Sequence, residues 1–374
     1  MAESVRAFSA DLFGALARAT HGAPANIVVS PYSAACALAM TLQGARGETA
    51  EQIARVLHLA ADGGSAYGEL GSELTSAAET TGEVSLDLAN SVWAEQSLDW
   101  KQEFLAALET GHKAAFQRAD FRTGSAAVAD RINAWVAERT HDKITELFTP
   151  SMIDKDSRLV LVNAAYFKAA WQQPFQGPAD DRPFTLADGN VVRVATMSQT
   201  FRRIGLAAGA GWQAVQLDFV GNRMAMALVL PDGPVDRLQQ QLSGGSIREL
   251  LEPYEPVGAL QVQLPKWSFH CRYELTDPLA ELGMPLAFDQ RSADFGQMTD
   301  DEPLVISTAV QEAYVAVDEQ GAEAAAATGV GMVRAAALTR PRELIFDRPF
   351  LFMIFDRLTR VPIFIGRVSD PRRR

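Results

Sequence analysis

The order of helical and strand patterns along the 374-residue chain is the feature that most constrains its fold. In the first half, residues 33–43 form an apolar run that is typical of a buried helix, and apolar residues recur with helical spacing over residues 49–59 and 126–139. The pattern then changes to short, apolar, β-prone segments that are separated by turn residues. These segments are 159–167, 191–197, 212–219, 224–230, 260–269, 309–317 and 350–355. Because helices precede strands rather than alternate with them, we expect an α+β architecture instead of a doubly wound sheet.

The composition is that of a globular protein. Hydrophobic residues make up 48% of the chain, which is enough for a core and too much for disorder. No internal repeat and no Pro- or Ser-rich linker divides the sequence, so we expect one domain over residues 1–374. Acidic residues outnumber basic ones 46 to 34, and the net charge of −12 repels phosphate groups. We therefore expect no nucleic acid and no membrane as a partner.

The N-terminus lacks the apolar core of a secretory signal peptide and runs directly into an amphipathic pattern that includes Phe8, Leu12 and Leu16. No stretch approaches the roughly 18 consecutive apolar residues that a membrane-spanning helix needs. Cys36 and Cys271 lie far apart in the sequence and are expected to be separate buried thiols. We expect a soluble protein that is either cytoplasmic or secreted after processing, and the sequence does not decide between these locations.

The motifs of common enzymes are missing from the sequence. The five histidines form neither an HExxH motif nor a pair at metal-binding helical spacing. The chain also lacks the GxSxG, GxxxxGK[ST] and GxGxxG patterns that mark a nucleophile elbow, a phosphate loop and a dinucleotide site. We therefore expect no metal, no cofactor and no catalytic activity.

An alanine-rich segment over residues 319–331 is the most unusual part of the sequence. Local propensity favours a helix there, because alanine is the best helix former. However, the run is short, lies between Gly321 and Gly329, and has no apolar stripe to bury. On composition alone, the segment is predicted to be an exposed loop.

The same segment resembles the hinge of the serpins, a family of large conformational protease inhibitors. The residues that match this hinge are Glu319, Gly321, Ala322, Glu323, Ala324, Ala325, Ala326, Ala327 and Thr328. Further matches to the family follow in the family's order at residues 26–33, 44–49, 132–144, 161–175, 346–350 and 366–368. Because these matches span nearly the whole chain, the protein resembles serpins of the inhibitory, prokaryotic-like type.

The resemblance implies the serpin fold, with three β-sheets, eight or nine helices and an exposed reactive-centre loop over about residues 319–345. It implies that a target serine protease cleaves this loop and forms a covalent acyl-enzyme. Residues 321–334 would then insert as a new strand into the main sheet and trap the protease. The family's mechanism needs no cofactor, and its members usually act as monomers.

The hinge residues suit such an insertion. In a strand, alternate side chains share a face, so one face would carry Ala322, Ala324, Ala326 and Thr328. These side chains are small and uncharged, so they can enter the interior without a clash or a desolvated ion. Glu323 falls on the opposite face, and Gly321 offers backbone freedom where the chain turns into the sheet.

The resemblance also implies two control regions. The breach, where the loop first enters the sheet, would contain Trp171, Lys266 and Glu319, with an ion pair between the last two. The alternative is a solvated ion pair that contributes little stability. The shutter, a polar cluster beneath the centre of the sheet, would contain Ser30, Ser33, Asn163 and Gln311. Gln311 stands where the family usually has a histidine, and it cannot titrate near neutral pH.

The family's usual spacing of sixteen residues from Glu319 places the scissile bond between Ala335 and Ala336. A small residue before the bond suits elastase-like or subtilisin-like proteases. Arg334 would instead suit a trypsin-like enzyme, and Leu338, reached by counting back from Pro349, would suit a chymotrypsin-like one. We prefer the count from the hinge, because strand insertion measures the loop from that end.

Other functions remain as alternatives. A non-inhibitory serpin with a storage or chaperone-like role is one, although the small residues over 322–328 argue against it. A hydrolase is another, although no nucleophile–base pair is evident. A heparin site is not expected, because residues 67–83, where such serpins carry a basic helix, contain no Lys or Arg.

Overall fold

A computed structural model describes most of the chain, and within it the expected α+β fold is confirmed. The described residues are 1–20, 25–60, 65–79, 84–112, 115–176, 179–252, 254–322 and 341–372. Over these ranges the chain forms nine α-helices, two short 3-10 helices and three β-sheets. No helix in the described ranges is both long enough and apolar enough to cross a membrane.

The helices lie mainly in the first half of the chain, as the apolar periodicity predicts. They are α1 (Ala2–Ala19), α2 (Pro31–Leu42), α3 (Gly47–Val56), α4 (Ser65–Glu79), α5 (Gln102–His112), α6 (Phe121–Arg139), α7 (Val235–Gln240), α8 (Gly244–Leu251) and α9 (Thr276–Leu282). The start of α2 follows from its sequence, because the Ser30 hydroxyl caps the helix by accepting a hydrogen bond from the Ser33 amide. Pro31 occupies the first turn, where a missing N–H costs nothing.

The strands form a six-stranded main sheet, a seven-stranded sheet and a four-stranded sheet within the described residues. The main sheet has the order β12 (Trp267–Glu274), β13 (Thr308–Val317), β14 (Gly321–Ala322), β4 (Leu159–Ala170), β2 (Val84–Glu95), β3 (Ala115–Ala119). The second has the order β1 (Ile27–Val29), β17 (Val361–Val368), β16 (Phe350–Asp356), β9 (Met224–Pro231), β8 (Trp212–Asp218), β7 (Ile204–Gly209), β10 (Glu255–Val257). The third has the order β15 (Arg342–Ile345), β11 (Leu260–Pro265), β6 (Val191–Phe201), β5 (Asp180–Thr185).

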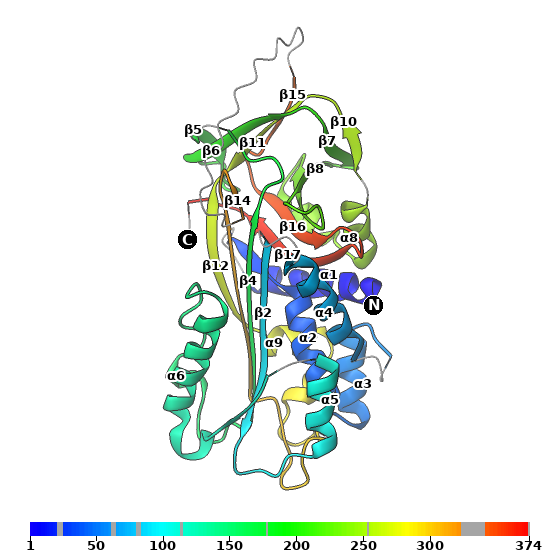
Figure 1. Cartoon of the computed structure of the whole chain (residues 1–374), viewed down its shortest axis with the longest axis vertical. Coiled ribbons are helices and arrows are strands. Elements are labelled where there is room, and N and C mark those ends of the chain that lie inside the picture. The colour runs from blue at the N-terminus through cyan, green and yellow to red at the C-terminus, as the bar shows by residue number, and fades with distance from the viewer. Residues whose placement is uncertain are drawn as a thin grey trace.

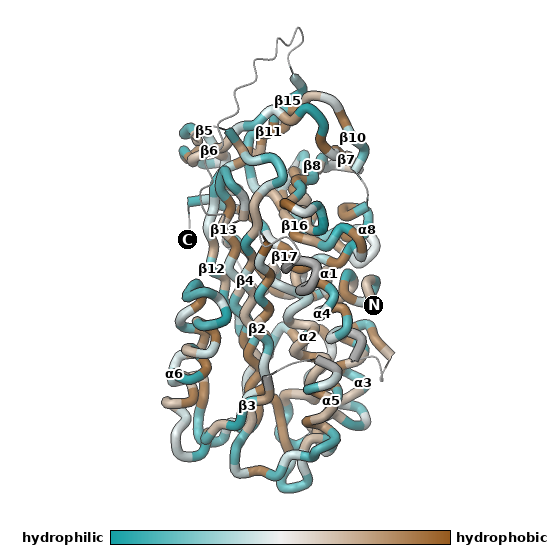
Figure 2. The backbone as a smooth tube through the Cα atoms, viewed as in Figure 1, coloured by the Kyte–Doolittle hydropathy of each residue, from teal (hydrophilic) through white to brown (hydrophobic). Residues whose placement is uncertain are grey.

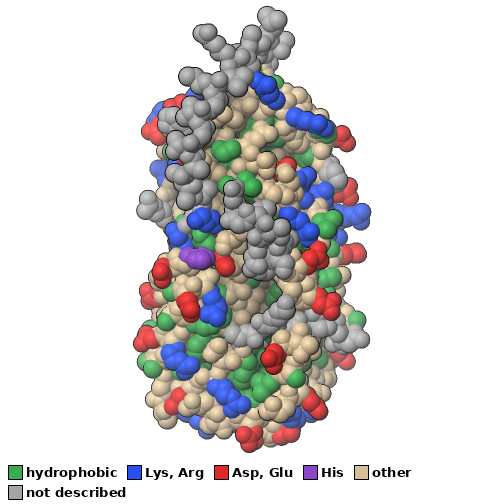
Figure 3. Space-filling view, in the orientation of Figure 1, with side chains coloured by type: hydrophobic (Ala, Val, Ile, Leu, Met, Phe, Trp, Pro, Cys, Tyr) green, Lys and Arg blue, Asp and Glu red, His purple; other side chains and the backbone are tan. Residues whose placement is uncertain are grey.

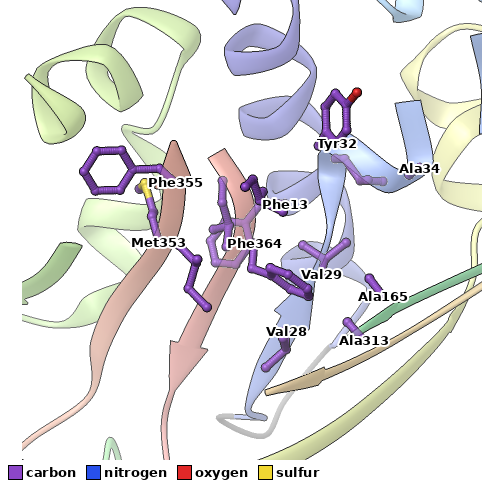
Figure 4. Packing of buried hydrophobic residues seen from close by; sticks show 14 of the residues in the cluster. Phe13, Val28, Val29, Tyr32, Ala34, Ala165, Ala313, Met353, Phe355 and Phe364 are labelled. Carbon is purple, nitrogen blue, oxygen red and sulfur yellow. The ribbon is translucent and has the colours of Figure 1, made fainter. Parts of the chain in front are cut away.

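The main sheet runs along the length of the molecule, with α6 on one side and α2 to α5 on the other (Figure 1). Hydrophobic residues gather along the central strands, and hydrophilic residues dominate the turns at both ends (Figure 2). In the core, Ala165 of β4 and Ala313 of β13 lie close to β1, whose residues Val28 and Val29 point to opposite faces of that strand (Figure 4). These small side chains bring the main sheet close to the seven-stranded sheet.

One predicted strand is wrong. The sequence favours a single strand over residues 260–269, but the structure divides it into β11 and β12, which belong to different sheets. The division falls at Lys266, directly after Pro265, which has no N–H to donate to a sheet. The apolar alternation changes parity here, from Leu260, Val262 and Leu264 to Trp267 and Phe269, so the break was visible in the sequence. The long strand β2 is also absent from the predicted elements.

The pairing of β4 with β13 determines where the main sheet is open. From Thr308 to Tyr314, β13 pairs in parallel with Val160 to Tyr166 of β4. Above this stretch the two strands separate, and β14 pairs antiparallel with both of them. The main sheet is therefore closed in its centre and open at one end.

Candidate functional site

The hinge enters the main sheet at its open end. Ala322 pairs with Val317 of β13 and with Ala169 of β4, and its side chain is fully buried. Gly321 lies against the backbone of β4, so a Cβ atom there would collide with the carbonyl oxygen of Ala169. Close approach to β4 therefore requires glycine at this position, a reason that adds to the conformational freedom expected from the sequence.

The structure brings together the three residues that the resemblance assigns to the breach. Lys266 Nζ lies 2.7 Å from Glu319 Oε2, and the Glu319 side chain is 18% exposed. The backbone amide of Trp171 donates to the Gln320 carbonyl, so the residue after β4 is bonded to the hinge itself. The Trp171 ring stacks on Phe219 at a centroid distance of 4.6 Å, which ties the hinge to the seven-stranded sheet behind it.

Asp318 belongs to the same cluster, although the sequence analysis did not identify it. Its carboxylate accepts hydrogen bonds from the amides of Gln320, at 2.8 Å, and Gly321, at 3.2 Å. Its carbonyl accepts from Trp171 Nε1 at 3.0 Å. An aspartate two residues before a turn amide is a common turn former, so its place in the sequence was a usable signal. Asp318 therefore holds the turn that leads from β13 into β14.

The Lys266–Glu319 pair predicts a pH-dependent stabilisation of the breach. Partial burial is the largest single influence and would raise the pKa of Glu319. The hydrogen bond and charge of Lys266, together with backbone hydrogen bonds, outweigh it and hold this pKa below its usual value. A lowered pKa means that the carboxylate stabilises the fold above its ordinary pKa, near 4.5, and that this contribution disappears as the pH falls through the lower, folded-state value. We expect Glu319→Gln to lower the thermal midpoint at pH 7, by the equivalent of about 1 kcal/mol or less, and the difference to shrink as the pH falls below 4.5.

Thermal melts of both proteins between pH 3 and pH 7 measure this difference. Glu343→Gln is the matched control, because Glu343 is an exposed glutamate on β15. A melting difference for Glu319→Gln that stays constant over this pH range would show that the ion pair does not stabilise the breach.

The shutter residues form one buried hydrogen-bonded cluster beneath the centre of the main sheet. Asn163 of β4 and Gln311 of β13 pair in register, and Gln311 Nε2 donates to Asn163 Oδ1. Gln311 also bonds Ser30 twice, accepting from its amide at 3.0 Å and donating to its carbonyl at 2.9 Å. Asn163 Nδ2 donates to Ser33 Oγ at 2.7 Å. The cluster therefore connects β4 and β13 to the start of α2.

Asn90 of β2 completes this cluster and was missed in the sequence. It lies opposite Asn163 in the sheet, and its Oδ1 accepts from Ser33 Oγ at 2.8 Å and from Asn163 Nδ2. Three amide side chains, Asn90, Asn163 and Gln311, thus lie in one row across β2, β4 and β13. Asn90 is one of several polar residues in β2, so its type alone does not single it out, and the sequence patterns do not predict β2.

Removal of Gln311 should weaken the shutter strongly. Gln311→Ala leaves two buried groups, the Ser30 amide and Asn163 Oδ1, without a partner, while the Ser30 carbonyl keeps the amide of Ala34. Each orphaned buried group costs about 1–3 kcal/mol, so we expect the free energy of unfolding to fall by about 3 kcal/mol or more. Urea denaturation measures the loss. Gln261→Ala is the matched control, since Gln261 is half-buried on β11 and bonds only Ser198 among the described side chains. Equal losses in the two variants would contradict a special role for the cluster.

The remaining residues assigned from the resemblance lie outside the described residues. These are the hinge positions Glu323, Ala324, Ala325, Ala326, Ala327 and Thr328, and the reactive-bond candidates Arg334, Ala335, Ala336 and Leu338. Their roles stay predictions. The face of the molecule in Figure 3 mixes basic and acidic side chains among its described residues, without one large patch of either sign.

Comparison with known proteins places the chain in a family. The family model for serpin (serine protease inhibitor) matches residues 3–371. A leukocyte elastase inhibitor from Bos taurus is 35% identical and covers 97% of each chain. An uncharacterized serpin-like protein from Thermococcus kodakarensis is 33% identical over 99% of this chain and 85% of its own. The thermophilic serpin tengpin in its native state superposes with a TM-score of 0.88 at 26% identity, over 98% of this chain and 93% of its own. The chain belongs to the serpin family of serine protease inhibitors.

Proposed function

We propose that this serpin traps serine proteases by a suicide-substrate mechanism. A protease would cleave the reactive-centre loop and form an acyl-enzyme, and residues 321–334 would then insert between β13 and β4. The observation that carries this proposal is the position of β14. Gly321 and Ala322 already pair between these two strands, at the only end of their interface that is open in the described part of the sheet.

The strand registers support a continuous insertion. If the pairing of β14 with β4 and with β13 continues downward, Thr328 comes to lie opposite both Asn163 and Gln311. These two residues now bond each other at the shutter, so their bond must break as the strand arrives. The same register places residue 332 opposite Leu159, the first residue of β4, which lies at the end of the strand far from the breach. The proposed strand therefore matches the length of its partner closely.

The inserted strand would place small side chains on the buried face of the sheet and its charged side chain on the opposite face. Ala322 already occupies the buried face together with Val317 and Ala169, and residues 324, 326 and 328 share its parity. Glu323 would fall on the opposite face, directly across from Lys168 of β4. An opposite charge at this cross-strand position favours the inserted state modestly.

As targets we propose elastase-like or subtilisin-like proteases, which would cleave the loop after Ala335. The small side chain of Ala335 supports this choice, and so does the similarity to leukocyte elastase inhibitors. Trypsin-like cleavage after Arg334 and chymotrypsin-like cleavage after Leu338 are the less favoured sites. We further propose that the inhibitor acts as a monomer and without heparin.

The test mixes the protein separately with elastase, subtilisin, chymotrypsin and trypsin and separates each mixture on a denaturing gel. We expect an SDS-stable band at the summed mass with elastase or subtilisin, and a C-terminal fragment that begins at Ala336 by mass spectrometry. Cleavage without such a band for all four proteases would instead favour a non-inhibitory serpin with a storage or chaperone-like role.

A further inference from the structure

A cavity of about 460 Å³ lies beside the breach, behind the hinge. It is bounded by the residues that follow β4, by β7 and β8, by Tyr254 and Pro256, and by the turn that joins β16 to β17. Its apolar wall contains Trp171, Phe201, Ile204, Leu217 and Tyr254. This volume and this largely aromatic wall suit a small organic molecule.

The cavity carries an excess of positive charge. Arg203, Arg357 and Arg360 line it, and among its described lining residues Asp218 is the one carboxylate. Asp218 is already engaged, because Gln216 Nε2 donates to it at 2.6 Å and Arg357 Nη1 lies 3.5 Å away. The positive excess is unusual in a chain whose net charge is −12.

Two of these arginines lack acceptors for buried N–H groups. Arg357 Nε and Arg360 Nη1 are buried and have no hydrogen-bond partner in the described part of the chain. Burial, and next the charge of Arg357, lower the pKa of Arg360. Buried polar groups in folded proteins are nearly always paired, and an unpaired donor on a charged group is costly. Both N–H groups lie beneath the surface of the cavity, so a ligand reaches them when these side chains turn toward it.

We propose that this cavity binds a small organic carboxylate with an aromatic or aliphatic body. On binding, Arg357 and Arg360 turn toward the cavity and each donates to one oxygen of the carboxylate, which forms two charge-assisted hydrogen bonds. Arg203, which is exposed, adds a third positive charge at the mouth of the cavity. The body of the ligand packs against Trp171 and Tyr254, and this apolar contact favours an organic acid over an inorganic anion.

Isothermal titration calorimetry of the whole chain with 2-naphthoate tests the site. The neutral analogue 2-naphthylmethanol has nearly the same shape and no charge. We expect 2-naphthoate to bind with 1:1 stoichiometry and at least tenfold more tightly than the alcohol. Equal affinities for the two compounds, or no binding of 2-naphthoate at millimolar concentration, would overturn the proposal.

Variants locate the binding. Arg360→Gln should weaken 2-naphthoate binding at least tenfold, and Arg203→Gln about threefold. The second variant covers the possibility that Arg360→Gln does not fold, because Arg203 is exposed and its side chain makes no hydrogen bond within the described residues. Arg182→Gln, on β5 at the edge of the four-stranded sheet, is the matched control and should bind like the unmodified protein. Unchanged affinity in both arginine variants of the cavity would place the ligand elsewhere.

Discussion

Ala322→Arg should convert the inhibitor into a substrate. Ala322 is fully buried between Val317 and Ala169, so an arginine at this position would have to lose its hydration to stay in the sheet. Burying an unpaired charge costs several kcal/mol, which exceeds what the first residues of a new strand can return. The protease would then complete hydrolysis before the strand inserts. We expect the fraction of protein in the SDS-stable complex to fall at least tenfold while loop cleavage continues.

The matched control is Glu323→Arg, the same side chain one position further along the hinge. The strand register places residue 323 on the other face of the sheet, across from Lys168 and Ala316, which are both partly exposed. An arginine there keeps its hydration, and its repulsion from Lys168 is weak at a solvated site. Complex formation should therefore fall less than twofold. If both arginine variants lose the complex equally, the hinge does not insert in the register that β14 defines.

Cleavage of the loop should stabilise the protein greatly. Insertion replaces the parallel pairing of β4 and β13 with a new strand that is hydrogen-bonded on both sides along β4. At about 1 kcal/mol net for each hydrogen bond, a strand of this length adds on the order of 10 kcal/mol. For a chain of 374 residues this gain corresponds to a rise of at least about 10 °C in the thermal midpoint. Circular dichroism melts before and after loop cleavage measure the rise.

Cleaved Ala322→Arg is the control for this measurement, because its loop is cut while insertion is blocked at the first position. It should melt within about 2 °C of its uncleaved form. A cleaved unmodified protein that gains no stability would show that the uncleaved sheet is not metastable. Such a result would support the non-inhibitory alternative.

Local sequence patterns predicted elements whose causes are local. The helix α2 follows from the Ser30 cap, Pro31 and a continuous apolar run, and the strand β4 follows from a β-prone segment that is buried on both faces. The strand β2 was missed because polar residues interrupt its apolar pattern. One of these residues, Asn90, accepts a hydrogen bond from Asn163 in the shutter. The break at Lys266 was missed although Pro265 and a change in the parity of the apolar residues both mark it.

The candidate site depends on contacts between distant residues, which no local pattern specifies. Lys266 and Glu319 are 53 residues apart in the sequence, and Ser30 and Gln311 are 281 apart. Only the resemblance to a family indicated that they would lie together. Residues that the resemblance did not mark, such as Asp318 and Asn90, became visible when the structure supplied their partners. The arginine cavity had no signal at all, because its walls come from several separate segments.

The placement of the last three strands determines how a cut molecule behaves in solution. The strand β15 pairs with β11, and every residue of β16 and β17 is buried in the middle of the seven-stranded sheet. A break in the backbone ahead of β15 therefore leaves two polypeptides whose shared core is intact. Without denaturant they should co-elute as one particle with the mass of the whole chain. The C-terminal piece is in effect a tightly bound peptide subunit, and its separation requires unfolding of the core that holds it.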